Sequence, residues 1–247
     1  YTIQISAADC TGCEVCVNQC PGKKGAKALS MVNVNELHHN GTYKDSEYFF
    51  NNVSYKTDLV DITANAKNSQ FAQPLFEFSG ACGGCGETPY VKLITQLFGD
   101  RMVVANATGC SSIYGGSYPA SPYTKNSEGM GPAWANSLFE DNAEFGYGMK
   151  MGNESLRERL AGYMAEVANC EEADPQVKAL CQEWLENRKN GEVTKRIAKE
   201  LIPLLEGKDC ETAKNILTLK DYIVKTSQWI FGGDGWAYDI GYGGLDH

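Results

Sequence analysis

The sequence predicts an α/β domain over residues 74–247, preceded by a short cysteine-dense module at 1–35 and a polar linker at 36–73. Three observations lead to this prediction. Four of the ten cysteines crowd into the first module, and the linker shows no long helical period. From about residue 74, amphipathic helical segments alternate with short apolar runs that end in glycine-rich turns. With 247 residues, of which 43% are hydrophobic, the chain can form one or two packed domains.

Composition and charge exclude several classes of partner. The formal net charge is −9 and the sequence contains no dense stripe of Lys and Arg, so we expect no nucleic-acid partner. No apolar run is long enough to span a membrane, and the N-terminus does not resemble a secretory signal, so we expect a cytoplasmic protein with no membrane partner. The chain begins within a strand-like pattern and ends within an amphipathic stretch, so we expect a fragment of a longer protein.

The first two expected elements are strands. Tyr1, Ile3 and Ile5 alternate with polar residues, which is typical of a half-buried strand, and residues 28–32 form a second apolar run.

Helix signals begin after the linker. Thr88 and Pro89 predict an N-cap and the first helical position, and Gly99 predicts the end of that helix. Its expected apolar face consists of Tyr90, Val91, Ile94, Leu97 and Phe98.

Residues 101–107 then predict a short buried strand, and 108–132 a long functional loop. The stretch 154–225 is predicted to be helical, with two apolar stripes. One stripe consists of Leu156, Leu160, Tyr163, Met164 and Val167, and the other of Val177, Leu180, Cys181, Trp184 and Leu185. Residues 228–231 predict a strand that runs directly into a glycine turn at 232–235.

The strongest motif is formed by the four N-terminal cysteines. Cys10, Cys13, Cys16 and Cys20, followed by Pro21, have the CxxCxxCxxxCP spacing of bacterial ferredoxins, which bind cubane [4Fe–4S] clusters. In that spacing the fourth cysteine serves the other cluster of a two-cluster fold. The alternative is structural zinc, which usually takes two cysteine pairs held apart by a longer spacer. The spacing favours iron and sulfur over zinc.

A second cysteine set could supply three ligands of a further cluster. Cys82 and Cys85 form a CxxC motif, and Cys110 follows the predicted strand 101–107, with glycines beside all three. A CxxC motif alone also suits a redox pair or half of a zinc site. The other cysteines lie on an apolar stripe or at helix ends and are expected to bind no metal, namely Cys170, Cys181 and Cys210.

The glycine turn after residue 231 suits a diphosphate. A strand, a turn carrying Asp234 and a following helix direct a carboxylate and helix N–H groups at one point, where Mg²⁺ could bridge a diphosphate. The helix is expected to open with residues 237–240. The GDG sequence is common by itself, and an ordinary strand-end turn is its alternative interpretation.

Taken together, residues 78–89, 107–115, 131–134 and 232–244 closely resemble the pyruvate:ferredoxin (flavodoxin) oxidoreductases. The resemblance implies part of an α/β thiamine-diphosphate-binding domain, preceded by half of an α+β two-[4Fe–4S] ferredoxin-like module. It implies that Cys82, Cys85 and Cys110 bind the cluster nearest to thiamine diphosphate, with a fourth cysteine beyond His247, and that Asp234 binds Mg²⁺. The residues it assigns to the thiamine diphosphate site are Glu87, Cys110, Ile113, Gly233, Asp234, Gly235 and Trp236.

The function implied by the resemblance is the oxidative decarboxylation of pyruvate with coenzyme A to acetyl-CoA and CO₂. Electrons would pass one at a time through three [4Fe–4S] clusters to ferredoxin or flavodoxin. The pyruvate-binding residues are expected in the remainder of the polypeptide, so the chain alone is expected to be inactive, and the whole enzyme is expected to be a homodimer. The alternatives are a non-enzymatic iron–sulfur electron-transfer module, the same chemistry on another 2-oxoacid, or a zinc-dependent structural protein.

Overall fold

The structure, a computed structural model, describes residues 5–244. The chain divides into two compact units. The first unit comprises Tyr1–Asp100 and Cys110–Gly131, and the second comprises Arg101–Gly109 and Pro132–His247.

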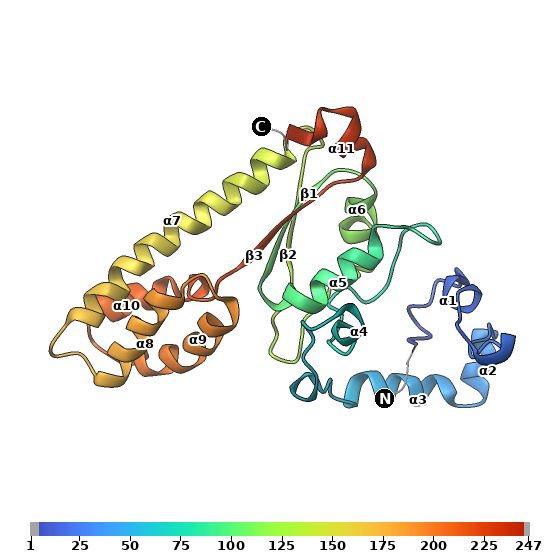
Figure 1. Cartoon of the computed structure of the whole chain (residues 1–247), viewed down its shortest axis with the longest axis horizontal. Helices are drawn as coiled ribbons and strands as arrows, with labels where there is room; N and C mark the ends of the chain where they lie inside the picture. Colours follow the sequence, from blue (N-terminus) through green and yellow to red (C-terminus); the bar gives the residue numbers. More distant parts are fainter. Residues whose placement is uncertain (1–4, 245–247) are drawn as a thin grey trace. The chain divides into compact units, whose positions relative to one another are not determined.

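A three-stranded parallel sheet organises the second unit (Figure 1). Its strands are β1 (Met102–Ala107), β2 (Ala133–Ser137) and β3 (Ser227–Phe231), in the order β2-β1-β3. Both pairings are parallel, and Val104 of the central strand lies opposite Trp134 on one side and Trp229 on the other. The sheet confirms the predicted α/β class for this part of the chain.

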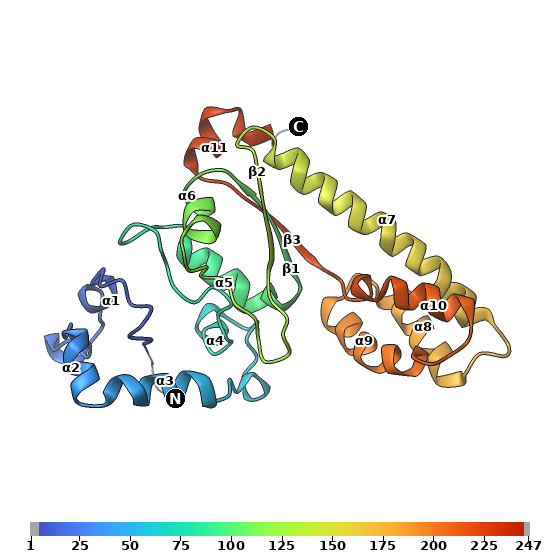
Figure 2. The ribbon, with the colours of Figure 1, turned by 180° about the vertical axis from the view of Figure 1, so that it is seen from behind.

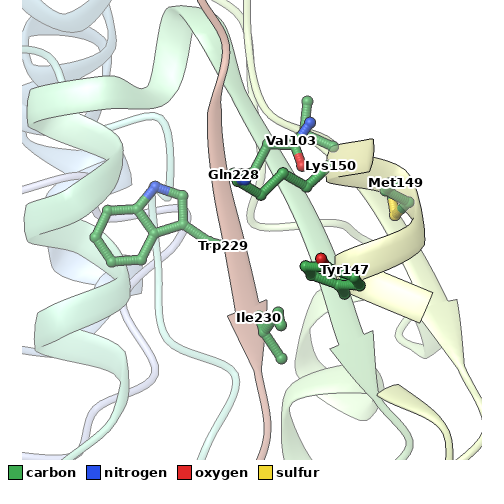
Figure 3. Close-up of a pocket in the computed structure, with 9 residues that line it drawn as sticks. Val103, Tyr147, Met149, Lys150, Gln228, Trp229 and Ile230 are labelled. Carbon is green, nitrogen blue, oxygen red and sulfur yellow. The ribbon is translucent and has the colours of Figure 1, made fainter. Parts of the chain in front are cut away.

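The first half of helix α7 (Asn142–Asn169) lies on one face of this sheet. Gly146 permits the close approach, because a Cβ at that position would lie 2.5 Å from a side-chain carbon of Ile230 and 3.2 Å from Cβ of Ala105. Figure 3 shows that Ile230 points towards the side of β3 on which Tyr147 lies, whereas Trp229 points away from it. A mainly apolar cavity of about 120 Å³ remains between helix and sheet.

The second half of α7 belongs to a separate helical cluster in the same unit, together with α8 (Pro175–Asn187), α9 (Gly191–Leu205) and α10 (Glu211–Thr218). Figures 1 and 2 show α7 running from the sheet to this cluster. The two predicted apolar stripes are confirmed, since Leu160 and Met164 of one and Trp184 of the other are fully buried in one core.

A buried arginine fastens this cluster. The guanidinium of Arg157 donates to the backbone carbonyls of Tyr222, Ile223 and Arg188, and it lies 5.2 Å from the ring centroid of Trp184. The indole Nε1 of Trp184 donates to the Ile223 carbonyl at 2.9 Å. Because buried polar groups need partners, these bonds fix the segment that leads back to β3.

We expect Trp184→Ala to lower the free energy of unfolding by about 3–5 kcal/mol, because it leaves a cavity in a closed core and removes one of the two hydrogen bonds to the Ile223 carbonyl. Trp184→Phe keeps most of the volume, so its effect should be smaller. Urea unfolding followed by circular dichroism measures both. Equal destabilisation by the two variants would contradict the packing argument.

The first unit is built from short helices. They are α1 (Val15–Asn18), α2 (Val34–His39), α3 (Thr42–Asn52), α4 (Ala66–Ser69), α5 (Thr88–Phe98) and α6 (Cys110–Ser112), which continues into a π-helical turn, Ile113–Ser117. The second unit also contains α11 (Asp234–Asp239). Short 3₁₀ turns occupy Lys23–Gly25, Thr57–Leu59, Gly99–Arg101, Lys220–Tyr222 and Tyr242–Gly244.

The buried part of the first unit centres on Phe76. Its ring meets Tyr114 and Tyr123 edge-on, with centroid distances of 5.8 and 5.3 Å. Phe76 also forms an isolated antiparallel bridge with Tyr123. This aromatic group ties the segment before α5 to the segment after α6.

Several predicted elements are confirmed. Helix α5 starts at Thr88, one residue before the predicted first helical position, and is capped by Gly99. Strands β1 and β3 lie where the apolar runs predict them. Of the predicted face of α5, Val91 is buried, whereas Tyr90 is exposed.

Other predictions are wrong. Residues 28–32 form no strand, because no other described segment pairs with them. The stretch 36–73 does contain a helix of 11 residues, α3, although the linker assignment itself stays a prediction. The helical region begins at Asn142 rather than at 154.

Two expectations fall on the ends of the chain. Residues 1–4 of the predicted first strand lie outside the described residues, and so do residues 245–247 of the amphipathic stretch. Within residues 5–244, no helix is both long enough and apolar enough to cross a membrane.

Candidate functional site

The carboxyl ends of the three strands lie at one edge of the sheet, where ligands of parallel α/β sheets bind. Asn142 holds these ends together. Its Nδ2 donates to the Phe231 carbonyl at 2.8 Å and to the Ala105 carbonyl at 3.4 Å, and its Oδ1 accepts from Ser137 Oγ at 2.8 Å. Asn142 is fully buried, so one side chain fixes the ends of all three strands.

A second set of polar bonds joins the segment after β1 to β2. Asn136 Nδ2 donates to Thr108 Oγ1 at 3.0 Å, and Thr108 Oγ1 donates to the Ser137 carbonyl at 2.8 Å. Asn106, also fully buried, donates from Nδ2 to Asn136 Oδ1 at 3.2 Å. The carboxyl edge therefore has a rigid polar lining.

The glycine turn after β3 is shaped by Trp236. A Cβ on Gly232 would lie 2.1 Å from the indole, and a Cβ on Gly243 would lie 2.3 Å from it. The glycines are required there, because any side chain would collide with the buried ring. Asp234 is the first residue of α11 and is exposed, and Gly233 has no atom within 4 Å of its Cβ position. The predicted strand, turn and helix are present, with the helix starting three residues earlier than expected.

The second cysteine set lies in the first unit. The Cys85 N–H donates to the Cys82 carbonyl at 3.0 Å, and Gly84 has a φ of +78°, so Cys82 to Cys85 form a tight turn. Cys82 and Cys110 are exposed and Cys85 is partly exposed, and Cys110 opens α6.

Glu87 follows this turn at the start of α5 and acts on two buried phenols. Burial, and next the negative charge of Glu87, raise the pKa of Tyr114, and the same two causes raise the pKa of Tyr123. Both phenols therefore stay protonated at neutral pH.

The segment from Cys110 to Tyr123 contains unsatisfied polar groups. The hydroxyls of Ser111 and Tyr123 are buried and have no hydrogen-bond partner among the described residues. Ile113, by contrast, is a large apolar side chain that is 48% exposed. Unpaired buried hydroxyls and an exposed apolar side chain are both features of a surface that a ligand covers.

Backbone N–H groups surround one cysteine of the ferredoxin-like motif. The Ala28 N–H donates to Cys20 Sγ at 3.2 Å, and this bond, followed by that of Leu29, lowers the pKa of the Cys20 thiol. Such bonds stabilise a thiolate, the form that ligates metal. Cys10, Cys13 and Cys16 are exposed.

The two cysteine motifs meet within the first unit. A Cβ placed on Gly83 would lie 3.3 Å from Cys13 Cβ. The ferredoxin-like spacing and the CxxC turn, which are about 70 residues apart in sequence, are therefore neighbours at this point.

The structure does not gather either set into a preformed cage. Across residues 5–244, no three Cys, His, Asp or Glu side chains are grouped closely enough to hold a metal ion. Cluster ligation by the seven cysteines therefore stays a prediction. Cys181 is buried in the helical cluster, which raises its pKa to about 11, whereas Cys170 and Cys210 are exposed.

The sequence interpretation missed Asn142 and β2. Asp141, the N-cap of α7, and Asn142, its first residue, form a typical helix start and could have revealed the helix boundary. Nothing in the sequence indicated that Asn142 would bond to all three strands, because its partners are 5, 37 and 89 residues away.

Comparison with known proteins gives the same indication as the motifs. The chain is 48% identical over 254 residues to "Pyruvate:ferredoxin oxidoreductase" of Moorella thermoacetica and 47% identical over 258 residues to "Pyruvate-flavodoxin oxidoreductase" of a Nostoc species. It is 45% identical over 283 residues to "Pyruvate dehydrogenase [NADP(+)]" of Cryptosporidium parvum. Each match covers 100% of this chain, but only 21%, 21% and 14% of the respective relative. No protein-family model matches the chain.

The chain thus spans about a fifth of the length of the first two relatives. Overall identity at this level, in alignments that cover the whole chain, reflects common descent, and the motif residues quoted from the sequence lie inside the matched region. Over its full length the chain is similar to one region of the pyruvate:ferredoxin and pyruvate:flavodoxin oxidoreductases.

Proposed function

We propose that this chain is part of an enzyme that oxidatively decarboxylates pyruvate with coenzyme A, giving acetyl-CoA and CO₂ and passing electrons to ferredoxin or flavodoxin. The names of the three relatives all contain pyruvate but give different electron acceptors. They therefore support pyruvate as the substrate more strongly than any one electron acceptor. The chain's own part would be the electron exit and a portion of the thiamine diphosphate site.

The observation that carries this proposal is the contact between the two cysteine motifs. Gly83, inside the CxxC turn, lies against Cys13 of the ferredoxin-like spacing. Electron carriers must lie close together to exchange electrons, and this contact joins the two sets without an intervening side chain. A structural zinc protein would have no need for it.

The residues also fit the cofactors chemically. Thiolates are the ligands of iron–sulfur clusters, and Cys10, Cys13, Cys16 and Cys20 would hold clusters of the ferredoxin type. Cys82, Cys85 and Cys110 would hold a third. The unpaired hydroxyls of Ser111 and Tyr123 would gain partners from a polar cofactor. Thiamine diphosphate supplies the carbanion chemistry of 2-oxoacid cleavage, and the clusters supply one-electron transfer.

The protein residues position these groups. Glu87, held at the start of α5, would contact the cofactor with a negative charge, and Ile113 would cover it with an apolar surface. In the second unit Asp234 would bind Mg²⁺, while Gly233, Gly235 and Trp236 shape the turn that presents it. Asn142 fixes the strand ends from which that turn starts.

The test is the cofactor content and activity of the intact protein. We expect iron, acid-labile sulfide and thiamine diphosphate in the purified protein, and ferredoxin or flavodoxin reduction that requires both pyruvate and coenzyme A. Zinc without sulfide would contradict the proposal. Iron and sulfide without thiamine diphosphate would indicate a bare electron-transfer module, and faster turnover of another 2-oxoacid would change the substrate.

The Gly83 contact makes a separate prediction. In Gly83→Val the new side chain must push Cys13 away, since even its Cβ would lie 3.3 Å from Cys13 Cβ. We expect slower reduction of the ferredoxin-type clusters by pyruvate, with unchanged reduction by dithionite, measured by stopped-flow absorbance. Gly86→Ala is the matched control, because its Cβ would meet nothing within 4 Å. Equal rates in both variants would contradict an electron path through this contact.

A further inference from the structure

A pocket of about 330 Å³ in the second unit collects positive charge. It lies beside α7, the start of α9 and the start of β3, and its charged lining consists of Arg101, Lys150, Lys189, Lys225 and Glu154. We call these five residues and the space they line the cationic pocket. Arg101 precedes β1 and Ser227 opens β3, so the pocket lies at the amino ends of the strands, opposite the edge that carries Asp234. It is therefore distinct from the site described above.

The concentration of cations is unusual for this chain, whose formal net charge is −9. At physiological ionic strength, charges more than about 8 Å apart are largely screened from one another. An anion in the pocket therefore responds mainly to the charged lining, in which four cations outnumber the single carboxylate of Glu154, and not to the acidic residues elsewhere.

Two of the cations are already paired. Lys150 Nζ lies 3.0 Å from Glu154 Oε1, and Arg101 Nε lies 3.6 Å from Glu192 Oε1. No carboxylate of the described residues forms an ion pair with Lys189 or Lys225. Within residues 5–244 these two lysines have no ion-pair partner, and the one carboxylate that lines the pocket with them, Glu154, is already paired with Lys150.

Part of the pocket is held in place before any ligand arrives. Arg101 Nη1 donates to the Lys225 carbonyl at 3.5 Å, and the guanidinium packs over Gly191, where a Cβ would lie 2.5 Å from Cζ. The Lys225 N–H donates to Thr194 Oγ1 at 3.0 Å, and its Nζ donates to the Thr226 carbonyl at 3.0 Å. A preorganised site loses less conformational entropy on binding than a flexible one.

The electrostatics agree with this geometry. Burial, and after it the positive charge of Arg157, lower the pKa of Lys225, with Lys150 and Arg101 adding to the effect and Glu154 opposing it. Positive charges are thus crowded against one another, and a bound anion would relieve their repulsion.

We propose that the cationic pocket binds a phosphate-bearing anion. Its cations come from four segments, α7, the loop before α9 and the residues just before β1 and β3, so they can contact several oxygens of one polyanion. A monocarboxylate has one charge for these contacts, whereas a diphosphate has at least two. The volume accommodates a diphosphate with a small attached group. This inference does not depend on the proposed function.

Isothermal titration calorimetry tests the proposal on the intact protein, loaded with thiamine diphosphate and Mg²⁺ at the carboxyl-edge site and then freed of the unbound excess, which would compete for the cationic pocket. Pyrophosphate and ADP are expected to bind, and adenosine is not. If ADP binds much more tightly than pyrophosphate, the ligand is a nucleotide. If ADP and pyrophosphate bind with equal affinity, the ligand is a free phosphate anion. Absence of pyrophosphate binding, or adenosine binding as tight as that of ADP, would overturn it.

Variants locate the binding. Lys189→Gln and Lys225→Gln should each weaken pyrophosphate affinity about tenfold, the effect of one charge-assisted contact. Lys220→Gln makes the same charge change at an exposed lysine that does not line the pocket, and should leave the affinity unchanged. Because Lys189 is exposed, its variant is expected to fold normally even if Lys225→Gln does not. Affinity that is equal in Lys189→Gln and Lys220→Gln would place the binding elsewhere and overturn the proposal.

Discussion

Replacing Asp234 with asparagine in the intact protein is expected to weaken the binding of thiamine diphosphate and Mg²⁺ about a hundredfold or more, while the iron–sulfur absorbance stays unchanged. Mg²⁺ prefers anionic oxygen ligands, and the loss of even an outer partner of a metal ligand lowers affinity 10–100-fold. Asp234 is exposed at the first position of α11, so its loss removes no core contact. Thiamine diphosphate in the denatured supernatant and the visible iron–sulfur absorbance are the measurements.

Asp239→Asn is the matched control, since Asp239 is an exposed aspartate at the end of the same helix. It should retain the cofactor. Thiamine diphosphate occupancy in Asp234→Asn equal to that in Asp239→Asn would refute the Mg²⁺ assignment without affecting the assignment of the cysteines.

Cys110→Ser is expected to separate carbon chemistry from electron exit. A serine oxygen is a harder ligand than a thiolate and holds iron–sulfur clusters poorly, so the cluster nearest to thiamine diphosphate should be lost or shifted in potential. Release of CO₂ from pyruvate in a first turnover should survive, whereas reduction of ferredoxin by pyruvate should fall at least about a hundredfold. Labelled CO₂ release, iron content and acceptor reduction together test this.

The control is Cys170→Ser, a change at an exposed cysteine that is predicted to bind no metal. It should keep full iron content and full acceptor reduction. If Cys110→Ser behaves like this control, Cys110 is not a cluster ligand, and the assignment of three clusters would reduce to the ferredoxin-like motif alone.

The fold was predictable where apolar residues are contiguous or regularly spaced. β1 and β3 are short apolar runs next to glycine, and the helical cluster shows two clear stripes. β2 reads Ala-Trp-Ala-Asn-Ser, without an apolar run, and becomes a strand only because it pairs with β1. In α3 the apolar Tyr48, Phe49 and Phe50 are consecutive, so no helical period is visible.

The glycine turn was predictable, but the reason for its glycines was not. The sequence indicated a turn that presents Asp234 and helix N–H groups to a diphosphate, whereas the structure shows Gly232 and Gly243 packed on the indole of Trp236. Gly243 reaches Trp236 only because the backbone turns back after α11. Local sequence patterns do not indicate such a turn.

The cysteine spacing was the most informative local signal, yet the described residues do not gather the thiols into a cage. Thiolates carry like charges and are drawn together by the metal they share, so a site of this kind is completed when its metal binds. The cysteine spacing in the sequence is therefore a better guide to the ligands than the positions of the thiols in the metal-free chain.

The path of the chain between α7 and β3 also has a consequence for the order of folding. β1 pairs with β3 across more than 100 residues of intervening sequence, whereas the helical cluster is built from helices that follow one another. Contacts that are near in sequence form first, because they close short loops. Once the cluster forms, it brings the residue before β3 close to the middle of α7, where the Thr226 hydroxyl donates to Asn153 Oδ1 at 3.4 Å. We therefore expect the helical cluster to fold first and to bring β3 close to β1. The sheet and the polar residues at its carboxyl edge are then expected to form last.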